Sequence, residues 1–505
     1  MKFKELILYK VAKFLFADCK LLNAFYISGK YSTYYEFSKK ISAIRCDVTN
    51  IITQNSICAI AIHDDIETYA SIFALWMEGK AYVPLHPNQP LERNLNIIEQ
   101  VEIKTVLDSA EHSVFSDHCN VINTSKCEYT KDYLDNWVEI DDNELAYILF
   151  TSGSTGVPKG VQITRGNVAA FMDSFWETGI KIDENDRCLQ VFDLTFDVSV
   201  QSYLVALTRG ACVYTVPYGQ VKYLYAASLI QEQKITFGAM APSMLTYLRP
   251  YFDEFDATSM KATILTAEAC PVDLMEDWFK CAKNTEIYDF YGPTEATIYC
   301  TYYKLTKGGD NMSQNGIISI GKPLKHVGAI IIDDEGNIIN DNSKGELCVS
   351  GAQVTPGYWN NPERNEASFF IKEINGQEVR FYHTGDLCYY GDGGNILYCG
   401  RIDQQAKIQG FRVELGEIEF HARDFYSKEK RVVAIAFDND KKLTEIALFI
   451  ESSSIDDAKL LEYLRSKMPH YMIPSRIICL NEFPLNKSEK IDRNELKKKL
   501  CQEKN

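Results

Sequence analysis

A row of hydroxyl and glycine residues that ends in a lysine lies at residues 151–160, with the sequence TSGSTGVPKG. Glycines let backbone N–H groups turn inward, and the hydroxyls add further hydrogen-bond donors. Such a concave row of donors suits a polyphosphate, and Lys159 adds a compact positive charge. A Walker A loop is excluded, because Pro158 precedes the lysine and a glycine follows it in place of serine or threonine. We therefore predict a phosphate-binding loop; the alternative is an ordinary surface loop rich in serine and glycine.

This loop resembles the phosphate loop of the adenylate-forming superfamily, which includes acyl-CoA synthetases, luciferases and the amino-acid adenylation domains of peptide synthetases. Further motifs in the expected order extend the resemblance over nearly the whole chain. The resemblance implies that ATP contacts the following loop residues: Thr151, Ser152, Gly153, Ser154, Thr155, Gly156 and Lys159.

A second motif, YDFYGPTEAT at residues 288–297, contains a tight Gly-Pro turn. Tyr291 offers an aromatic face on which adenine can stack, and Asp289 can accept a hydrogen bond from the adenine amino group. Thr294 can reach the α-phosphate, and Glu295 supplies the hard oxygen that Mg²⁺ prefers. A Gly-Pro-Thr-Glu turn alone would be unremarkable, but together with the phosphate loop it indicates a nucleotide site.

The resemblance implies further nucleotide contacts in the middle of the chain. Asp386, in the segment YHTGDL, resembles the carboxylate that binds both ribose hydroxyls. The other contacts are Glu268, Tyr398 and Arg401. The segments around Asp386 have a β-rich character, which fits the small barrel of the family.

Asp197 stands in the apolar run FDLTFDVSV at residues 192–200, which predicts a strand. A buried carboxylate needs a partner, and a substrate ammonium group would supply one. The alternative is an aspartate that caps a helix or forms a salt bridge in the core. In the amino-acid adenylation domains that the chain resembles, the matching aspartate binds the substrate's α-amino group. Acyl-CoA synthetases and luciferases typically lack it, so the resemblance implies an amino-acid substrate.

By the same resemblance, one acid, one amide and mostly apolar side chains line the substrate pocket. These residues are Asp197, Val198, Gln201, Ala239, Leu265, Ala267, Phe290, Ile298 and Tyr299. The composition fits a neutral amino acid of small to medium size, such as proline or an alanine-like residue, and the Asp-Val-Gln start resembles proline-activating pockets. D-alanine-activating relatives tend to carry a cysteine where this chain has Thr266, which argues against D-alanine.

The last hundred residues carry the positions that the resemblance implies for domain movement and thiol transfer. Asp403 matches the family's hinge, where a residue need only absorb a change in φ and ψ. Lys407 and Gly410 lie in the loop that passes the thiol acceptor. Lys490, in LNKSEKIDR, matches the catalytic lysine. Relatives have a glycine before this lysine, whereas here Ser-Glu precedes it, so Lys487 is a rival candidate.

Composition restricts the class of protein. The formal net charge of -16 argues against non-specific nucleic-acid binding. No apolar run is long enough to cross a bilayer, and charges interrupt residues 1–16, which predicts an amphipathic helix and not a secretory signal. The 15 cysteines are scattered without a C-x-x-C pair. We therefore expect reduced thiols in the cytoplasm, with neither a zinc site nor a disulfide framework.

Strand-like and helical runs alternate between residues 20 and 140, for example 57–62 and 68–77, which predicts an α/β fold with a largely parallel sheet. Asn167 is expected to cap a helix that ends at Phe175. We predict a large N-terminal domain, 1–402, that binds ATP and the amino acid. It is expected to consist of helix-flanked sheets plus a small β-barrel. A small mobile α+β domain, 403–505, is expected to form a lid that carries the catalytic lysine. Its predicted elements are a helix at 415–423, strands at 432–436 and 445–450, and a helix at 456–467.

The resemblance implies ATP- and Mg²⁺-dependent activation of an amino acid as aminoacyl-AMP. Transfer to the phosphopantetheine thiol of a separate carrier protein would follow. We expect a stand-alone monomer with no nucleic-acid partner. Two other functions stay open: an acyl-CoA synthetase for an acid without an amine, and a catalytically silent binding homologue. Asp197 argues against the first, and the presence of Lys490, Glu295 and Asp386 argues against the second.

Overall fold

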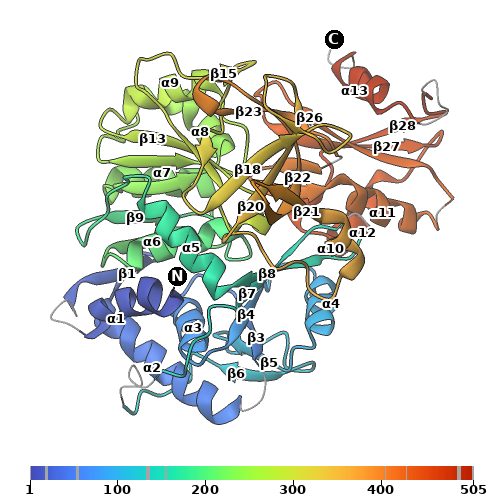
Figure 1. The fold of residues 1–505 in the computed structure, drawn as a ribbon. Coiled ribbons are helices and arrows are strands. Elements are labelled where there is room, and N and C mark those ends of the chain that lie inside the picture. The colour runs from blue at the N-terminus through green and yellow to red at the C-terminus, as the bar shows by residue number, and fades with distance from the viewer. Residues whose placement is uncertain are drawn as a thin grey trace. The chain divides into compact units, whose positions relative to one another are not determined.

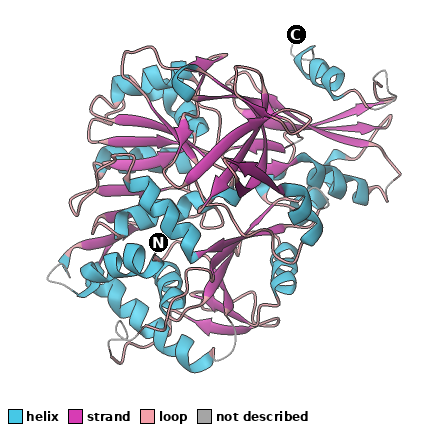
Figure 2. Cartoon of the chain, in the orientation of Figure 1, coloured by secondary structure: helices cyan, strands magenta, loops and turns pink. Residues whose placement is uncertain are grey.

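The computed structural model describes residues 2–16, 21–52, 56–131, 137–153, 156–403, 405–427, 429–485 and 491–502. The chain divides into two compact units. Unit 1 comprises Met1–Pro87, Ile98–Phe150 and Gly160–Ile402, and unit 2 comprises Asn88–Ile97, Thr151–Lys159 and Asp403–Asn505. Helices and strands alternate through much of the chain (Figure 2). No helix in these described ranges is long and apolar enough to cross a membrane.

A six-stranded sheet contains the strand that leads into the phosphate loop. Its strand order is β6-β5-β3-β4-β7-β8 (Figure 1). The bounds are β3 (Ile57–Ala61), β4 (Ala81–Leu85), β5 (Thr105–Asp108), β6 (Asn120–Asn123), β7 (Leu145–Thr151) and β8 (Lys159–Thr164). The pairs from β6 to β7 are parallel, with α3 (Ile66–Met77) connecting β3 to β4 and α4 (Leu91–Val101) connecting β4 to β5. The predicted strand at 57–62 and helix at 68–77 are therefore confirmed.

A nine-stranded sheet positions most of the predicted pocket residues. Its order is β17-β14-β13-β12-β11-β9-β10-β1-β2. The bounds are β1 (Asn23–Ile27), β2 (Lys30–Thr33), β9 (Arg187–Gln190), β10 (Cys212–Thr215), β11 (Phe237–Met240), β12 (Ala262–Leu265), β13 (Glu286–Tyr291), β14 (Thr301–Lys304) and β17 (Lys322–Pro323). The strands from β1 to β13 along this order are parallel, and β2, β14 and β17 add antiparallel edges. Ligands of such sheets bind beyond the carboxyl ends of the parallel strands, where β11, β12 and β13 bring their last residues together.

The helices of unit 1 pack largely against two apolar clusters. These helices are α1 (Tyr9–Phe16), α2 (Tyr34–Ile51), α3, α5 (Arg165–Trp176), α6 (Asp197–Leu207), α7 (Lys222–Glu232), α8 (Pro242–Leu248), α9 (Val272–Cys281) and α10 (Pro362–Ser368). Of these, α7, α8 and α9 pack in the second cluster. A π-helical segment, Lys4–Leu8, precedes α1, so the predicted N-terminal helix is present. Residues of both sheets, such as Tyr82 and Phe237, belong to the same buried cluster, so the sheets share a core.

Two local predictions were wrong. The run at 192–200 does not form a strand, because α6 begins at Asp197 with Phe196 as its N-cap. Every residue of α6 is buried, and the sequence of a helix that is apolar on all sides cannot be told from that of a buried strand. The N-cap of α5 is Thr164. Asn167 lies at the third helical position and completes a capping box with it, each side chain accepting the other's backbone N–H.

Residues 327–401 form a six-stranded antiparallel sheet where we expected a small barrel. Its strands are β18 (Val327–Ile332), β19 (Ile338–Ile339), β20 (Gly345–Gly351), β21 (Phe369–Ile374), β22 (Gln377–Tyr390) and β23 (Ile396–Arg401). The long strand β22 pairs with β20, β21 and β23, so it holds the sheet together. A short hairpin, β15 (Ser313–Gln314) and β16 (Ile317–Ile318), precedes this sheet.

Unit 2 contains the predicted elements of the C-terminal domain. A hairpin of β24 (Gln405–Ile408) and β25 (Phe411–Glu414) leads into α11 (Leu415–Phe425). A three-stranded sheet follows, with β26 (Val432–Asp438), β27 (Thr444–Glu451) and β28 (Arg476–Leu480), accompanied by α12 (Asp457–Lys467) and α13 (Arg493–Gln502). The predicted helices at 415–423 and 456–467 and strands at 432–436 and 445–450 are all present. Ile418, Leu448 and Leu460 lie in the core of this unit.

Candidate functional site

Asp197 is the first residue of α6, and its carboxylate is buried. The helix N-terminus favours an anion there, but the Oδ2 atom has no hydrogen-bond partner among the described residues. Burial, together with the charge of Glu295, raises the pKa of Asp197 to about 6, although a hydrogen bond with the Thr294 side chain opposes the rise. A buried carboxylate with one oxygen unsatisfied is costly unless a cation or a donor pairs with it.

Four of the other predicted pocket residues lie around Asp197. Gln201 follows it by one helical turn, and the Tyr299 hydroxyl donates to the Gln201 Oε1 atom over 3.3 Å. The rings of Tyr299 and Phe290 pack with their centroids 4.9 Å apart. The backbone at Ile298 also contributes a hydrogen bond to the Asp197 carboxylate. The structure thus brings the acid, the amide and the aromatic residues of the predicted pocket together.

The remaining predicted pocket residues lie close in the fold but face different clusters. Val198 and Ala239 belong to the same buried cluster as Phe290 and Tyr299. Leu265, at the end of β12, packs in a second apolar cluster instead. Ala267 follows this strand by two residues and is partly exposed.

The backbone around the pocket is strained. The φ angles of Ala267, Thr297 and Ile298 are +70°, +56° and +73°. Residues with a Cβ atom rarely adopt this left-handed region, and for a β-branched residue such as Ile298 it is a clear outlier. Strain of this kind persists where the surrounding structure imposes it, and it concentrates at ligand sites. The sequence carried no signal for this feature.

The predicted ribose contact Asp386 lies in a polar network on β22. Its Oδ1 atom is 3.0 Å from Nη1 of Arg401, which faces it across the β22–β23 pair. Tyr291, at the end of β13, donates its hydroxyl hydrogen to the Oδ2 atom. Arg401 also donates to the carbonyl oxygen of Thr384 over 2.8 Å. Three predicted nucleotide contacts therefore touch one another, and Arg401 and Tyr291 orient the Asp386 carboxylate.

Three other predicted nucleotide contacts lie on neighbouring segments. Asp289 is buried on β13 beside Leu265 of β12. Glu268 accepts the Ser243 backbone N–H over 2.8 Å, which ties the end of β12 to the start of α8. Tyr398 lies on β23 and pairs in register with Cys388.

Glu295 is fully buried and accepts a hydrogen bond from the Tyr358 hydroxyl over 2.6 Å. Its negative charge repels that of Asp197 and contributes to the raised pKa of that residue. A buried carboxylate with another acidic group nearby fits the needs of Mg²⁺, which binds one or two carboxylates and shares phosphate oxygens. Tyr358 was not predicted. It lies far from Glu295 in the sequence and in no pattern with it, so only the fold reveals the contact.

Residues 151–159 of the phosphate loop belong to unit 2, where carboxylates accept hydrogen bonds from them. The Gly153 N–H donates to Glu417 Oε2 over 2.9 Å, and the Lys159 ammonium group is 2.8 Å from Glu414 Oε1. The Ser152 hydroxyl donates to the carbonyl oxygen of Arg412 and accepts the N–H of Glu414. Donors that bind carboxylate oxygens can equally bind phosphate oxygens. Ser154 and Thr155 lie outside the described residues.

Neighbouring atoms leave no room for a Cβ atom at position 153 of this loop. A Cβ atom at position 153 would lie 2.0 Å from the carbonyl oxygen of Val157. Gly156 has a φ of +79° and donates its N–H to the carbonyl oxygen of Gly153 over 3.0 Å. Gly153 and Gly156 therefore approach neighbouring backbone in a way that side chains would prevent.

Glu414, Glu417 and Arg93 are functional candidates that sequence analysis missed. Glu417 is fully buried, and one of its oxygens is 2.6 Å from Nη1 of Arg93. The segment ELGEIE at 414–419 looks like the exposed face of a helix, yet Glu414, Glu417 and Glu419 are all buried. A run of acidic residues in an otherwise apolar segment is the signal that could have indicated buried partners.

The predicted hinge and thiol-transfer positions fall on the β24–β25 hairpin and just before it. Asp403 is the first residue of the C-terminal segment of unit 2, and its Oδ1 atom accepts the N–H of Gln405 over 3.1 Å. Lys407 pairs with Arg412 across the hairpin. Gln409 and Gly410 form its two-residue turn, and both have positive φ angles, as a type I′ turn requires. Lys487 and Lys490 lie outside the described residues.

Comparisons with known proteins agree on the family. The AMP-binding enzyme family matches residues 22–359. The chain is 31% identical over 447 residues to tyrocidine synthase 2 of Brevibacillus parabrevis, covering 88% of this chain but only 12% of that protein. It is 30% identical over 474 residues to zwittermicin A synthase ZmaJ of Bacillus cereus, covering 91% of this chain and 89% of that protein. The chain thus spans a small part of the tyrocidine synthase and most of ZmaJ.

Solved structures agree on the fold. The Vibrio cholerae adenylation domain AlmE in complex with glycyl-adenosine-5'-phosphate has a TM-score of 0.85 at 22% identity, with 99% of this chain and 98% of that chain covered. An artificially fused adenylation–PCP di-domain, NpsA-ThdA from Klebsiella oxytoca, has a TM-score of 0.83 at 22% identity, with 95% and 94% covered. From the family match and the identity to ZmaJ, the chain belongs to the AMP-binding enzymes of the adenylate-forming superfamily.

Proposed function

We propose that the chain activates a neutral amino acid as aminoacyl-AMP and transfers it to the phosphopantetheine thiol of a separate carrier protein. The observation that carries this proposal is the buried Asp197 carboxylate, whose Oδ2 atom has no partner among the described residues. A substrate ammonium group would satisfy this oxygen and remove the cost of its burial. A carboxylic acid without an amine would leave the charge unpaired.

The residues around Asp197 restrict the rest of the substrate. Phe290 and Tyr299 are large, buried and packed on each other, so they leave little room for a bulky side chain. Gln201 is the main polar group near them, and the predicted pocket residues, all of which the structure describes, include no acid or base besides Asp197. These properties support a small to medium neutral amino acid, such as proline or an alanine-like residue.

In the proposed reaction, the substrate carboxylate attacks the α-phosphorus of ATP and pyrophosphate leaves. Asp386 would accept hydrogen bonds from the ribose hydroxyls, and Arg401 with Tyr291 would keep its carboxylate oriented. The phosphate-loop donors, Gly153 N–H and the Lys159 ammonium group among them, would bind the phosphate oxygens on which charge grows. Glu295 would bind Mg²⁺, which neutralises phosphate charge when bound.

We also propose the domain roles that the sequence implies. Residues 1–402 would bind ATP and the amino acid, and residues 403–505 would form a mobile lid with Asp403 as its hinge. Lys490 would stabilise the charge that grows in the adenylation transition state. If Lys490 has this role, Lys490→Ala slows adenylate formation by orders of magnitude and Lys487→Ala does not; the reverse result would assign the role to Lys487.

Two of the solved structures support the chemistry. AlmE was solved with glycyl-adenosine-5'-phosphate, an aminoacyl adenylate, and NpsA-ThdA joins an adenylation domain to a PCP. A CoA synthetase, MenE from Bacillus subtilis, shares the fold as well, with a TM-score of 0.81 at 20% identity. Fold alone therefore identifies neither the class of acid nor the thiol acceptor, and the requirement for a substrate amine distinguishes the class of acid.

The test is ATP–pyrophosphate exchange with matched pairs of acids. Each amino acid is compared with the acid that has the same side chain and hydrogen in place of the amine. We expect exchange with one or a few neutral amino acids and none with their amine-free partners. Equal exchange with both members of a pair, or exchange with fatty or aryl acids only, would overturn the proposal and favour an acyl-CoA synthetase.

A further inference from the structure

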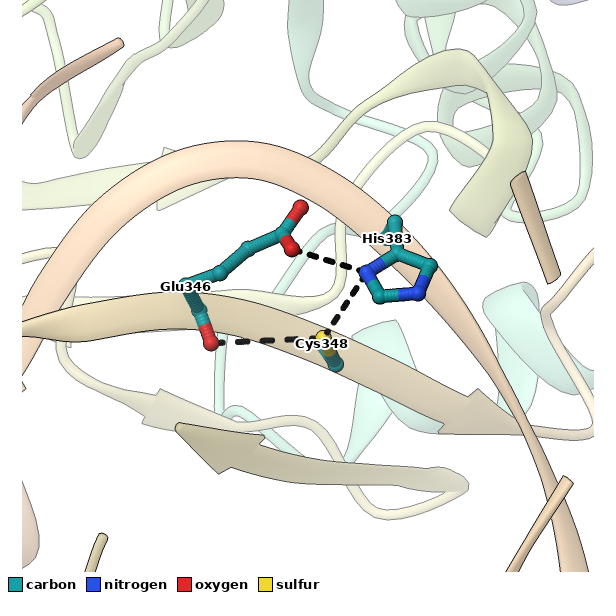
Figure 3. Close-up of side chains that lie close together, drawn as sticks. All are labelled: Glu346, Cys348 and His383. Carbon is teal, nitrogen blue, oxygen red and sulfur yellow. Dashed lines mark hydrogen bonds and ion pairs between the residues drawn. The ribbon is translucent and has the colours of Figure 1, made fainter. Parts of the chain in front are cut away.

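Three potential metal ligands converge on one side of the antiparallel sheet at 327–401, apart from the residues discussed above. Glu346 and Cys348 lie on β20, and His383 lies on β22 (Figure 3). The ligand atoms of the three side chains lie within 4.8 Å of one another. The His383 Nδ1 atom is 2.8 Å from Glu346 Oε2 and 3.7 Å from Cys348 Sγ.

The strand register explains why these residues meet. Residues two apart on a strand share a face, which places Glu346 and Cys348 on the same side of β20. His383 stands directly opposite Cys348 in the β20–β22 pair. The register shifts between Glu346 and Cys348, and such an irregularity re-aims side chains. Scattered positions in the sequence are thus brought together only by the sheet, which is why the cysteine spacing did not indicate a zinc site.

The geometry argues against a catalytic cysteine–histidine–glutamate relay. In a relay, the thiol contacts one ring nitrogen and the carboxylate contacts the other. Here the thiol and the carboxylate both face Nδ1, as the two dashed lines to this atom in Figure 3 show. Cys348 is also fully buried, so a substrate cannot reach its sulfur. Convergence of three ligand atoms on one point is instead what a metal ion requires.

The distance between Cys348 Sγ and His383 Nδ1 suits a small tetrahedral ion. Zinc bonds to sulfur at about 2.3 Å and to nitrogen at about 2.0 Å, which at a tetrahedral angle separates the two ligand atoms by about 3.5 Å. The observed Sγ–Nδ1 separation of 3.7 Å is close to this value. The Glu346 oxygen would need to move away from Nδ1 by roughly half an ångström, because a metal would replace the present hydrogen bond. Its side chain is partly exposed, which permits the shift.

Apolar packing supports Cys348 and His383, and two of the three side chains are partly exposed to solvent. Cys348 packs in a small apolar cluster with Ile332 and Phe381, and the His383 ring packs against Phe370 with centroids 4.4 Å apart. The side chains of His383 and Glu346 are 34% and 22% exposed, so water can reach the cluster from their side. Water could therefore occupy a fourth coordination position.

From these observations we propose that Glu346, Cys348 and His383 bind a divalent transition metal, with Zn²⁺ favoured by the mixed sulfur, nitrogen and oxygen donor set. The thiol proton passes to solvent when the metal–sulfur bond forms. The second oxygen of Glu346 accepts the N–H of Gly385 over 2.8 Å, and Gly385 precedes Asp386. A bound metal would thus fix the carboxylate that anchors the turn before Asp386.

The experiment uses the full-length chain, stripped of metal with a chelator and titrated with Co²⁺ as a spectroscopic probe. We expect one equivalent of Co²⁺ to produce a thiolate-to-cobalt charge-transfer absorption that excess Zn²⁺ removes. Cys348→Ser should abolish this absorption, and His383→Gln should weaken Co²⁺ binding by at least about tenfold. Cys399→Ser is the matched control, because Cys399 lies on β23 of the same sheet and should leave the absorption unchanged.

Absence of the absorption in the unmodified chain would overturn the proposal, as would its survival in Cys348→Ser. Because Cys348 is buried, its replacement could disturb folding, which circular dichroism would reveal. The partly exposed His383 provides the second criterion. A folded His383→Gln variant that binds Co²⁺ as tightly as the unmodified chain would also overturn the proposal.

Discussion

At the scale of single residues, the proposed function depends on carboxylates that are costly to bury. Asp197 and Glu295 are both buried, and the charge of Glu295 helps to raise the pKa of Asp197. Such an arrangement destabilises the free protein, and the proposed substrate ammonium group and metal ion would relieve it. The same arrangement therefore has measurable consequences for pH dependence, stability and metal dependence.

The first prediction concerns the pH dependence of amino-acid binding. Asp197 must be ionised to pair with an ammonium group, and its pKa in the free protein is about 6. The KM for the amino acid should therefore fall as the pH rises through about 6, while the KM for ATP follows another profile. ATP–pyrophosphate exchange measured across this range is the test. A KM for the amino acid that stays flat through this range would contradict the role of Asp197.

The second prediction concerns the cost of this residue to the free protein. The folded pKa of Asp197 lies above its ordinary value of 3.8, so the folded state is relatively more stable below that value and loses this stability as the pH rises through about 6. Asp197→Asn keeps the shape and removes the charge. Its thermal midpoint should exceed that of the unmodified chain at neutral pH, by an amount equivalent to at most about 3 kcal/mol, and the difference should vanish at low pH.

The same variant should lose amino-acid activation by about a hundredfold or more, because an ammonium group would be buried without its partner. Pyrophosphate exchange at saturating ATP measures the loss. An Asp197→Asn variant that is both less stable at neutral pH and fully active would show that the aspartate has a structural role in the core.

The third prediction concerns Glu295. Removing its charge should raise the Mg²⁺ concentration at which exchange is half-maximal, because Mg²⁺ would lose a carboxylate ligand. Glu295→Gln preserves the size of the side chain and can still accept the hydrogen bond of Tyr358. Tyr358→Phe is the control, since it removes the same hydrogen bond and keeps the carboxylate. An identical Mg²⁺ titration for the unmodified chain and Glu295→Gln would exclude Glu295 from the metal site.

At the scale of elements, the sequence predicted the alternation of strands and helices and the elements at 415–467, because their apolar periodicity is clear. It failed at α6, since a helix buried on every side has no polar face to reveal its period. It also failed to find the partners of the phosphate loop. Glu417 and Gly153 lie 264 residues apart, and a hydrogen bond over that separation leaves no local pattern.

The antiparallel sheet at 327–401 shows the same limit of sequence-based prediction. The motif residue Asp386 could be named from its segment, but the pairing of β20 with β22 that places Cys348 opposite His383 could not. Register depends on the whole sheet and on extra residues of β22 between His383 and Leu387, and neither is encoded in a short stretch of sequence. Sequence motifs therefore predicted ligand-binding positions, whereas the structure identified the groups that contact them.

The fourth prediction concerns the phosphate loop as an element. Gly153→Ala would place a methyl group 2.0 Å from the carbonyl oxygen of Val157, so the loop must change its path. The KM for ATP should rise by about tenfold or more, because several N–H donors lose their alignment together. An unchanged KM for ATP in Gly153→Ala would contradict the phosphate-binding role of the loop.

Gly179→Ala is the control for a general loss of stability. Its φ of +87° strains any residue with a Cβ atom, but that atom would meet nothing within 4 Å. This variant should therefore lower the thermal midpoint and leave the KM for ATP unchanged. A similar rise of the KM in both variants would mean that the effect of Gly153→Ala is one of stability alone.

At the scale of the whole molecule, unit 2 contains both residues 151–159 of the phosphate loop and the carboxylates that accept hydrogen bonds from them. Glu414 and Glu417 accept the Lys159 and Gly153 donors that ATP phosphates would need. The single Gly153 N–H cannot serve Glu417 and a phosphate oxygen at the same time, and the Lys159 ammonium group would have to share its donors between Glu414 and phosphate. If the loop binds ATP as we propose, the observed state is one that ATP would displace, and each carboxylate contact would reduce the apparent affinity for ATP.

The fifth prediction follows from this competition. Glu417→Gln should lower the KM for ATP in the exchange reaction by about fivefold, since a neutral amide holds the Gly153 N–H less strongly than a carboxylate does. Glu419→Gln is a matched control. Glu419 lies on the same helix, is also buried and pairs with Arg493 over 2.5 Å, but it makes no contact with the phosphate loop in the described residues. It should change stability in a similar way and leave the KM for ATP unaltered.

The comparison of these two variants separates competition from damage. Each replaces a buried, arginine-paired carboxylate by an amide, so a general loss of stability should appear in both thermal midpoints. Only competition for the phosphate loop predicts tighter ATP binding in one of them. If the KM for ATP rises in Glu417→Gln, the carboxylate supports the loop in its ATP-binding form. If the KM changes equally in both variants, the contact with Gly153 has no specific influence on nucleotide binding, and the competition account fails.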